Sequence, residues 1–325
     1  MLKNAFLSIQ TDTDFKELAL QVFKHQAENN AIYNQFLKHL NISISSVKNL
    51  EDIPFLPIQF FKSHKIVSST QKEQQIFSSS GTTGSLTSKH YVTDLSIYEN
   101  SYLKAFTLFY GAIEEYTVLA LLPSYLERKG SSLIYMVDDL IKKSKKIESG
   151  FYLNNLSDLK DKLIQLDNQG KKILLIGVSF ALLDLVEKHQ FQLKNTIIME
   201  TGGMKGRRKE LIRSELHELL KKGFGLKNIH SEYGMTELLS QAYSDGNGVF
   251  KTPPWMKIFI RDTEDPFWLL PNNQTGGINI IDLANVNSCS FIATQDLGKV
   301  LTNTTFEVLG RFDHSDIRGC NLLTH

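Results

Sequence analysis

The chain has 325 residues, of which 42% are hydrophobic and 22% charged, a composition typical of a globular protein with a packed core. Its 36 basic and 35 acidic residues leave a net charge of +1, which gives no indication of a nucleic-acid partner. No apolar run approaches the ~20 residues of a membrane span, no secretory signal is visible, and two cysteines are too few for a disulfide framework or a four-cysteine zinc site. We therefore expect a cytoplasmic protein with no membrane span.

The N-terminal region, residues 1–53, is predicted to be helical and to pack on the main domain. Apolar residues recur at helical spacing from about Asp14 to Leu40, and the segment that begins at Thr11 can supply an N-cap. Two prolines then predict an extended linker over residues 53–61, because the residue before a proline disfavours the helical conformation.

The main domain, residues 54–325, is expected to contain a loop followed by alternating strands and helices. Residues 78–88 are rich in serine, threonine and glycine and predict the loop. Strands are then expected at 116–122, 172–177, 196–199 and 228–231, and helices at 131–145, 181–189 and 206–222. Continuous apolar strands separated by amphipathic helices favour a mainly parallel sheet that is covered on both faces.

Near residue 255 the helical period disappears from the sequence. Short strand-like pieces follow at 257–261, 277–283, 290–293 and 305–309. The predicted fold class is therefore α/β, with mainly parallel sheets, flanking helices and a β-rich C-terminal section at 271–325.

One loop has the composition of a phosphate-binding site. It follows a predicted strand and consists of Ser79, Ser80, Gly81, Thr82, Thr83 and Gly84. Glycines let the backbone turn tightly and present N–H groups, and the hydroxyls add donors, which suits the oxygens of a triphosphate. No Gly-Lys-Ser/Thr ending follows, so this is not a Walker A loop, and no G-x-G-x-x-G occurs. On composition alone, a flexible surface loop accounts for the same residues.

A second candidate segment lies at 231–237, where a predicted strand ends and a helix is expected to begin. Tyr233 can stack on a purine, and Gly234 permits close approach of the backbone. Thr236 can hydrogen-bond a phosphate oxygen, and Glu237 can act as a metal ligand for Mg²⁺. An ordinary helix N-terminus, with the last two residues in its first turn, explains the same segment.

Both segments resemble motifs of the adenylate-forming (acyl-CoA synthetase-like) superfamily. S-S-G-T-T-G at 79–84 is identical to the core of its phosphate loop, and 233–237 is similar to its Y-G-x-T-E motif, in the expected order. The resemblance implies the superfamily's large-domain fold, ATP and Mg²⁺ as cofactors, and activation of a carboxylic acid as an acyl-adenylate. The lysine that often follows the loop is replaced by Thr87, so no catalytic lysine is assigned there.

A narrower resemblance is to the LuxE-type acyl-protein synthetases. It is carried by T-G-G-M-K-G-R at 201–207, L-P-S-Y-L-E-R at 122–128 and G-R-F-D-H-S-D-I-R-G-C at 310–320. Gly202 and Gly203 match the glycine segment that passes beside adenosine. Like that branch, the chain lacks the superfamily's small C-terminal domain and the lysine within it, which leaves open what supplies positive charge at the α-phosphate.

This branch implies a fatty-acid substrate and transfer of the acyl group to a protein cysteine. Cys320 lies in the matching place, and with Thr236 and Glu237 it completes the predicted catalytic residues. A small apolar residue closing a β-turn is the alternative explanation. The implied partner is an acyl-accepting reductase or a carrier protein.

Two further residues match the family's nucleotide site. Asp296 resembles the aspartate that binds the ribose hydroxyls, since a carboxylate is a natural acceptor for a diol. Arg311 resembles an arginine that faces the nucleotide. A simple turn at Asp296 and a solvated charge at Arg311 are the alternatives.

Three other functions remain open from the sequence. The first is an aryl- or acyl-CoA ligase of the phenylacetate-CoA ligase type, with coenzyme A as acceptor. The second is an α/β-class serine hydrolase, because G-V-S-F-A at 177–181 is nearly a nucleophile elbow, although an N-cap by Ser179 explains the same residues. The third is a scaffold that has kept the fold without the chemistry.

Overall fold

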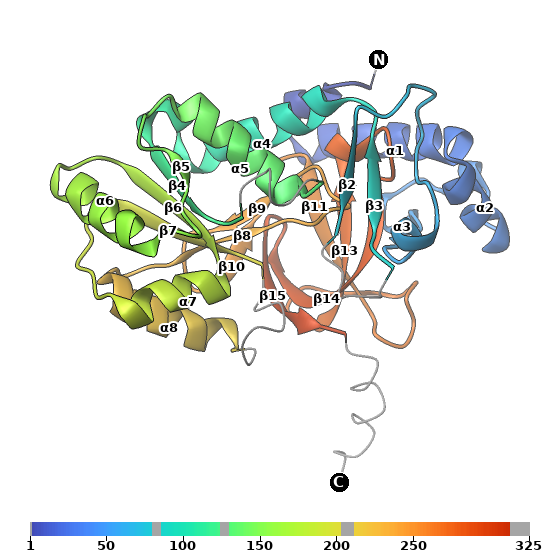
Figure 1. Cartoon of the computed structure of the whole chain (residues 1–325). Coiled ribbons are helices and arrows are strands. Elements are labelled where there is room, and N and C mark those ends of the chain that lie inside the picture. The colour runs from blue at the N-terminus through green and yellow to red at the C-terminus, as the bar shows by residue number, and fades with distance from the viewer. Residues whose placement is uncertain (1, 80–85, 124–129, 203–210, 313–325) are drawn as a thin grey trace, which may run out of the picture.

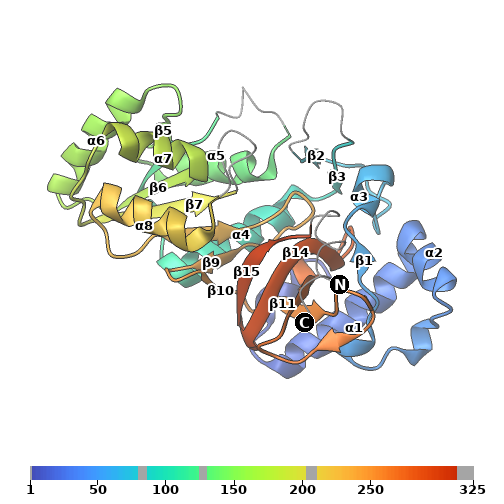
Figure 2. The ribbon, with the colours of Figure 1, turned by 90° about the horizontal axis from the view of Figure 1, so that it is seen from below.

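Most strands of the protein join a single large sheet. The computed structural model describes residues 2–79, 86–123, 130–202 and 211–312. Within them, a 13-stranded sheet runs in the order β12-β11-β13-β14-β15-β10-β9-β8-β7-β6-β4-β5, with β1 added on β14, and β2 and β3 form a separate hairpin. Figure 2 shows two lobes, one built on the parallel strands and the other on the β-rich section.

The first lobe contains the parallel strands predicted from the sequence. They are β4 (Thr117–Leu121), β5 (Gly150–Phe151), β6 (Ile173–Val178), β7 (Thr196–Thr201) and β8 (His230–Tyr233). Every neighbouring pair in the order β5-β4-β6-β7-β8 is parallel. All residues of β4 and β6 are buried, as expected for strands covered on both faces.

Helices cover both faces of these strands. Figure 1 shows α4 (Leu95–Tyr110) and α5 (Ser132–Ser144) on one side, with α7 (Ser179–Lys188) and α8 (Arg213–Phe224) on the other. The helix α6 (Leu156–Asn168) packs against β6. The sequence analysis missed α4 and α6. The predicted α/β fold, with parallel strands, flanking helices and a β-rich C-terminal section, is confirmed.

The β-rich lobe is antiparallel. Its strands are β9 (Ala242–Ser244), β10 (Val249–Lys251), β11 (Met256–Arg261), β12 (Leu269–Leu270), β13 (Thr275–Asp282), β14 (Phe291–Thr302) and β15 (Thr305–Arg311). The strand predicted at 290–293 is wrong in length, because β14 continues for 12 residues. Its later residues alternate between buried and partly exposed positions, a pattern that breaks the apolar run in the sequence.

The N-terminal segment folds as two helices against the β-rich lobe (Figure 2). They are α1 (Asp12–Asn29), which starts at the Thr11 N-cap, and α2 (Ala31–His39). The single predicted helix is interrupted at Asn30, whose side-chain oxygen caps α2 while its amide nitrogen donates to the Ser288 carbonyl. Phe23 of α1 packs against Phe291 of β14.

Short elements connect these parts. They are the 3₁₀ turns η1 (Ala5–Ser8), η2 (Ile44–Ser46), η3 (Leu50–Asp52), η4 (Ile113–Glu115) and η5 (Leu283–Asn285), the strand β1 (Leu56–Pro57) and the helix α3 (Phe60–Ser63). The predicted linker at 53–61 is therefore partly wrong, because β1 pairs with β14 and α3 begins before the linker ends. No helix among the residues described here is long and apolar enough to cross a membrane.

Candidate nucleotide and acid site

The hairpin that flanks the predicted phosphate loop contacts the second motif directly. The hairpin consists of β2 (Gln75–Ser78) and β3 (Lys89–Val92), and the loop residues lie between these strands in sequence. His90 of β3 lies with Nδ1 2.8 Å from the Thr236 carbonyl oxygen and Nε2 3.0 Å from Asn285 Oδ1. The side-chain amide of Asn285 in turn donates to the Glu237 carbonyl. The strand that follows the predicted phosphate loop therefore contacts the 231–237 segment through one buried histidine.

The surroundings of His90 determine the protonation state of its imidazole ring. Phe61 packs edge-on against the imidazole, and the ring is 1% exposed. Burial lowers the pKa of His90 to about 4, against the opposing effect of its two hydrogen bonds. The ring is consequently neutral at physiological pH and donates one hydrogen at a time.

Glu237 is buried beside the same hairpin. Burial raises the pKa of its carboxyl, while a hydrogen bond from Ser88 and the positive charges of Arg311 and Lys62 lower it. The backbone N–H of Ser88 also donates to Ser79 Oγ. The predicted metal ligand and the first residue of the predicted phosphate loop are thus joined through Ser88.

A second cluster joins β8 to the last two strands. Asp296 and Arg311 are directly opposite each other on β14 and β15, and Arg311 Nε donates to Asp296 Oδ1 at 3.1 Å. The Tyr233 hydroxyl donates to Asp296 Oδ2 at 2.9 Å. The Tyr233 ring is buried and makes edge contacts with Phe250 and Phe306. Three residues predicted to bind the nucleotide therefore lie together, although 63 residues separate Tyr233 from Asp296.

The carboxyl ends of β7 and β8 bring two predicted glycines close together. Thr201 pairs with Glu232 across these strands, and Gly202 follows with a φ of 68°, in the left-handed region that favours glycine. Thr201 Oγ1 donates to Glu232 Oε2 at 2.5 Å. Gly234, directly after β8, is exposed. Parallel sheets commonly bind ligands at this edge.

Several predicted site residues lie outside the described part of the structure. They are Ser80, Gly81, Thr82, Thr83, Gly84, Gly203 and Cys320. Their roles stay predictions. The other cysteine, Cys289, is fully buried, and burial raises the pKa of its thiol to about 12, which is unsuited to a nucleophile at neutral pH.

Ser179 has a structural partner and no histidine in contact within the described residues. Its hydroxyl lies 2.6 Å from the Gly202 carbonyl and 3.2 Å from Glu200 Oε2, and the side chain is 2% exposed. The N-cap explanation is wrong, because Val178 is the N-cap and Ser179 the first helical residue. Ser179 instead fixes the turn at Gly202.

The sequence analysis missed three contributors to the site. His90, Asn285 and Glu232 were not singled out, because their roles depend on contacts across 31 to 195 residues of sequence. A histidine two residues after a serine-rich loop carries no local signal. Of the three, Glu232 had the strongest signal in the sequence, because a charged residue at the end of a strand that is expected to be buried is unusual.

No cluster of three or more histidine, cysteine or acidic residues suited to a metal is found among the described residues. Mg²⁺ binds through one or two carboxylates together with substrate phosphates and water, so a single buried carboxylate such as Glu237 is compatible with it.

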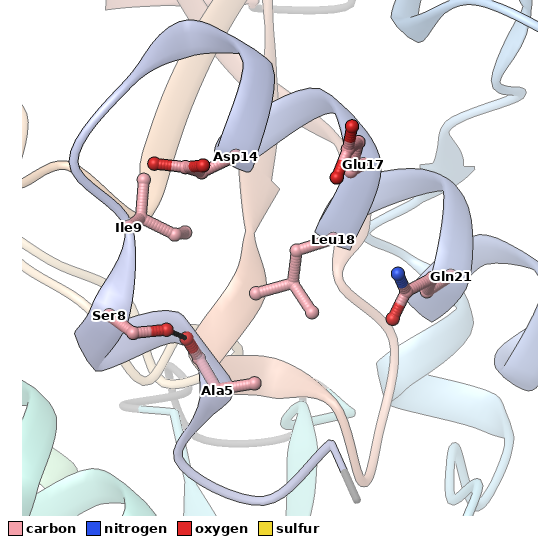
Figure 3. A pocket seen from close by; sticks show the side chains of 7 residues that line it. All are labelled: Ala5, Ser8, Ile9, Asp14, Glu17, Leu18 and Gln21. Atoms are coloured by element: carbon pink, nitrogen blue, oxygen red, sulfur yellow. Dashed lines mark hydrogen bonds between the residues drawn. The ribbon is translucent and has the colours of Figure 1, made fainter.

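Two cavities lie away from these residues. One, of about 180 Å³, is formed between η1 and α1 and is shown in Figure 3; it is lined by Ala5, Ser8, Ile9, Asp14, Glu17, Leu18 and Gln21. The Asp14 carboxylate there accepts hydrogen bonds from the Gln10 and Thr11 backbone and so serves the α1 cap. The other, of about 480 Å³, lies at the amino ends of β7 and β8 and includes His230 and Tyr243. Neither contains a predicted site residue.

Comparison with known proteins gives a related sequence and several related folds. No protein-family model matches the chain. A long-chain-fatty-acid–luciferin-component ligase from Vibrio harveyi is 25% identical over an alignment of 337 residues, which covers 92% of this chain and 84% of that protein.

Among solved structures, 2-hydroxyisobutyryl-CoA ligase in complex with 2-HIB-AMP and CoA gives a TM-score of 0.69 at 13% identity, over 93% of this chain and 70% of that one. ATP-bound MatB from Rhodopseudomonas palustris gives 0.54 at 16% identity, over 75% of this chain and 49% of MatB. The chain therefore spans about half the length of MatB. It has the fold of the adenylate-forming ligases, and its predicted resemblance to the LuxE-type acyl-protein synthetases is confirmed.

Proposed function

We propose that this protein activates a carboxylic acid with ATP, forming an acyl-adenylate and pyrophosphate. The observation that carries the proposal is the contact of His90 with the Thr236 carbonyl. It brings the hairpin on either side of residues 79–84 against the segment that contains Thr236 and Glu237. Adenylation requires groups for the triphosphate and for its metal in one place, and this contact supports that arrangement.

In the proposed reaction, each polar cluster has a separate task. Asp296, oriented by Tyr233 and Arg311, accepts hydrogen bonds from the ribose hydroxyls. The backbone and hydroxyls of 79–84 hold the phosphates, and Thr236 donates to a phosphate oxygen. Glu237 would hold Mg²⁺, which neutralises phosphate charge when bound. The substrate carboxylate oxygen attacks the α-phosphorus, the bond to the β-phosphate oxygen breaks, and pyrophosphate leaves with that electron pair.

We further propose that the acid is a fatty acid and that its acyl group passes to a protein thiol. The similarity to the luciferin-component ligase supports this choice over coenzyme A. The thiolate of Cys320 would attack the acyl carbonyl carbon, and AMP would leave. A reductase or a carrier protein would then accept the acyl group.

Adenylation is tested by ATP–pyrophosphate exchange over a panel of acids, with Mg²⁺ present. We expect acid-dependent exchange in the wild type and its loss in Glu237→Gln, while Glu114→Gln, an exposed residue of η4, retains it. Absence of exchange with every acid, with no ATP-induced rise in Tm, would contradict the proposal.

Thiol transfer is tested separately by mass spectrometry of the chain after incubation with ATP and the preferred acid. An acyl group on Cys320 that is lost in Cys320→Ser, with exchange retained, is the expected result. Unchanged labelling in Cys320→Ser would remove this step and favour coenzyme A as the acceptor.

A further inference from the structure

At the end of β8, the two faces of the sheet carry different side chains. Side chains alternate along a strand, so Tyr233 and Glu232 point to opposite faces of the sheet. Tyr233 lies with Asp296, where the ribose is proposed to bind, whereas Glu232 lies with Thr201. Gly234 is exposed directly after them. An acyl-adenylate with its adenosine on the Tyr233 side would therefore place its acyl group on the Glu232 side.

Two polar side chains lie beneath Gly234 on that side. A Cβ atom built at Gly234 would be 2.4 Å from Glu232 Oε1 and 3.4 Å from Gln241 Cγ, so both side chains border the space above this glycine. Glu232 is 9% exposed and Gln241 is 3% exposed. We call these two side chains the acyl floor. Apolar side chains at these two positions would bind a purely aliphatic acyl chain more favourably than Glu232 and Gln241 do.

The acyl floor contains an unmet hydrogen bond. Gln241 Oε1 is buried and has no hydrogen-bond partner among the residues that the structure describes. A buried polar atom without a partner is costly, and native proteins keep few of them. Thr201 donates to Glu232 Oε2, and no described residue donates to Oε1, the oxygen nearest Gly234.

We propose that the acyl floor binds a hydroxyl group next to the carboxyl of the substrate, so that the acid activated here is an α- or β-hydroxy acid. This inference rests on the proposed adenylation and specifies its substrate class. A hydroxyl donates one hydrogen and accepts others, so it satisfies Gln241 in either orientation of the amide. Burial raises the pKa of Glu232 to about 7, and the neutral carboxyl can donate to the same hydroxyl.

The position of the hydroxyl follows from the position of Gly234. This residue lies between the proposed ribose site and the acyl floor, so the reacting carboxyl has to lie close to it. A hydroxyl on the first or second carbon after the carboxyl reaches the floor, whereas one at the far end of a long chain does not. Acids that differ only in hydroxyl position therefore separate this inference from a general preference for polar acids.

The test compares ATP–pyrophosphate exchange with dodecanoate and its α-hydroxy, β-hydroxy and ω-hydroxy derivatives. We expect kcat/KM for the α- or β-hydroxy acid to exceed that for dodecanoate by about tenfold or more, since a buried acceptor is then paired. For the ω-hydroxy acid we expect the same kcat/KM as for dodecanoate. In Gln241→Met the preference disappears, whereas Gln165→Met, an exposed position on α6, keeps it.

Equal kcat/KM for dodecanoate and both the α- and β-hydroxy acids in the wild type would overturn the inference and assign the floor to bound water. This comparison needs no variant, so it holds even if Gln241→Met fails to fold. Exchange with dodecanoate in that case would leave the proposed adenylation intact. Absence of exchange with all four acids, and of stabilisation by ATP, would contradict adenylation and this inference together.

Discussion

Replacing the buried Glu232 with glutamine is expected to change how stability depends on pH. Burial raises the pKa of this carboxyl from 4.5 to about 7, and the charge of Glu200 adds to the rise, while the hydrogen bond from Thr201 opposes it. One pKa unit corresponds to about 1.4 kcal/mol, so ionising Glu232 in the folded protein costs roughly 3 kcal/mol. Glutamine has a similar shape and can still accept the Thr201 hydrogen bond.

The sign follows from proton binding in the two states. Between 4.5 and about 7 the folded protein keeps the proton that the unfolded chain has lost, so the free energy of unfolding falls as pH rises through this interval. Above it, both states are ionised and the loss is constant. Glu232→Gln removes this contribution, and the variant should gain roughly 3 kcal/mol relative to the wild type between about pH 5 and pH 8.

Urea unfolding of both proteins at about pH 5, 6, 7 and 8 measures this difference. Asp282 is also buried, with its pKa raised to about 6, but its contribution is common to both proteins and cancels. Glu114→Gln, at an exposed position, is the matched control and should follow the wild type. If the stability difference between Glu232→Gln and the wild type stays constant over this range, the assigned environment of Glu232 is wrong.

Three other substitutions test the site. Gly234→Ala places a Cβ atom 2.4 Å from Glu232 Oε1 and should destabilise the fold by about 1–3 kcal/mol; a double-mutant cycle with Glu232→Ala should recover most of this, and purely additive effects would exclude the clash. His90→Phe leaves the Thr236 carbonyl without its imidazole partner and should raise the KM for ATP as well as lower Tm, whereas a change in Tm alone would make His90 only structural. Asp296→Asn should weaken the binding of ATP more than the binding of its deoxyribose analogue, so the KM values for these two nucleotides should become similar. An unchanged ratio of the two KM values would exclude the ribose role of Asp296.

The order and type of most elements could be read from local pattern. The strands β4, β6 and β7 are almost entirely buried and each has a continuous apolar run, and helices with one apolar face follow them, so the parallel half of the fold was predictable. Elements with weaker local signals were not. The later part of β14 alternates between faces, and the break at Asn30 depends on a hydrogen bond to Ser288 on the far side of the sequence.

For the site, the sequence identified residue types but not their partners. Tyr233, Asp296 and Arg311 were predicted to share a nucleotide site, and the structure places them in one hydrogen-bonded cluster. The stacking of Tyr233 on the purine and the binding of the ribose by Asp296 and Arg311 stay predictions. Nothing in the local sequence distinguished His90 from the other histidines, and nothing indicated that the buried side-chain oxygen of Gln241 has no partner within the described part of the chain.

The order of the residues is enough to identify the two short motifs, the alternation of apolar strands with helices, and the class of chemistry that the motifs resemble. Those features depend on side-chain type and on spacing over a few residues, which the chain carries in its order. The contact of His90 with the Thr236 carbonyl, and the position of Glu232 and Gln241 next to Gly234, follow from the folded arrangement of distant segments. Burial, pKa and unmet hydrogen bonds are properties of an environment, and that environment is assembled from segments that are distant along the chain.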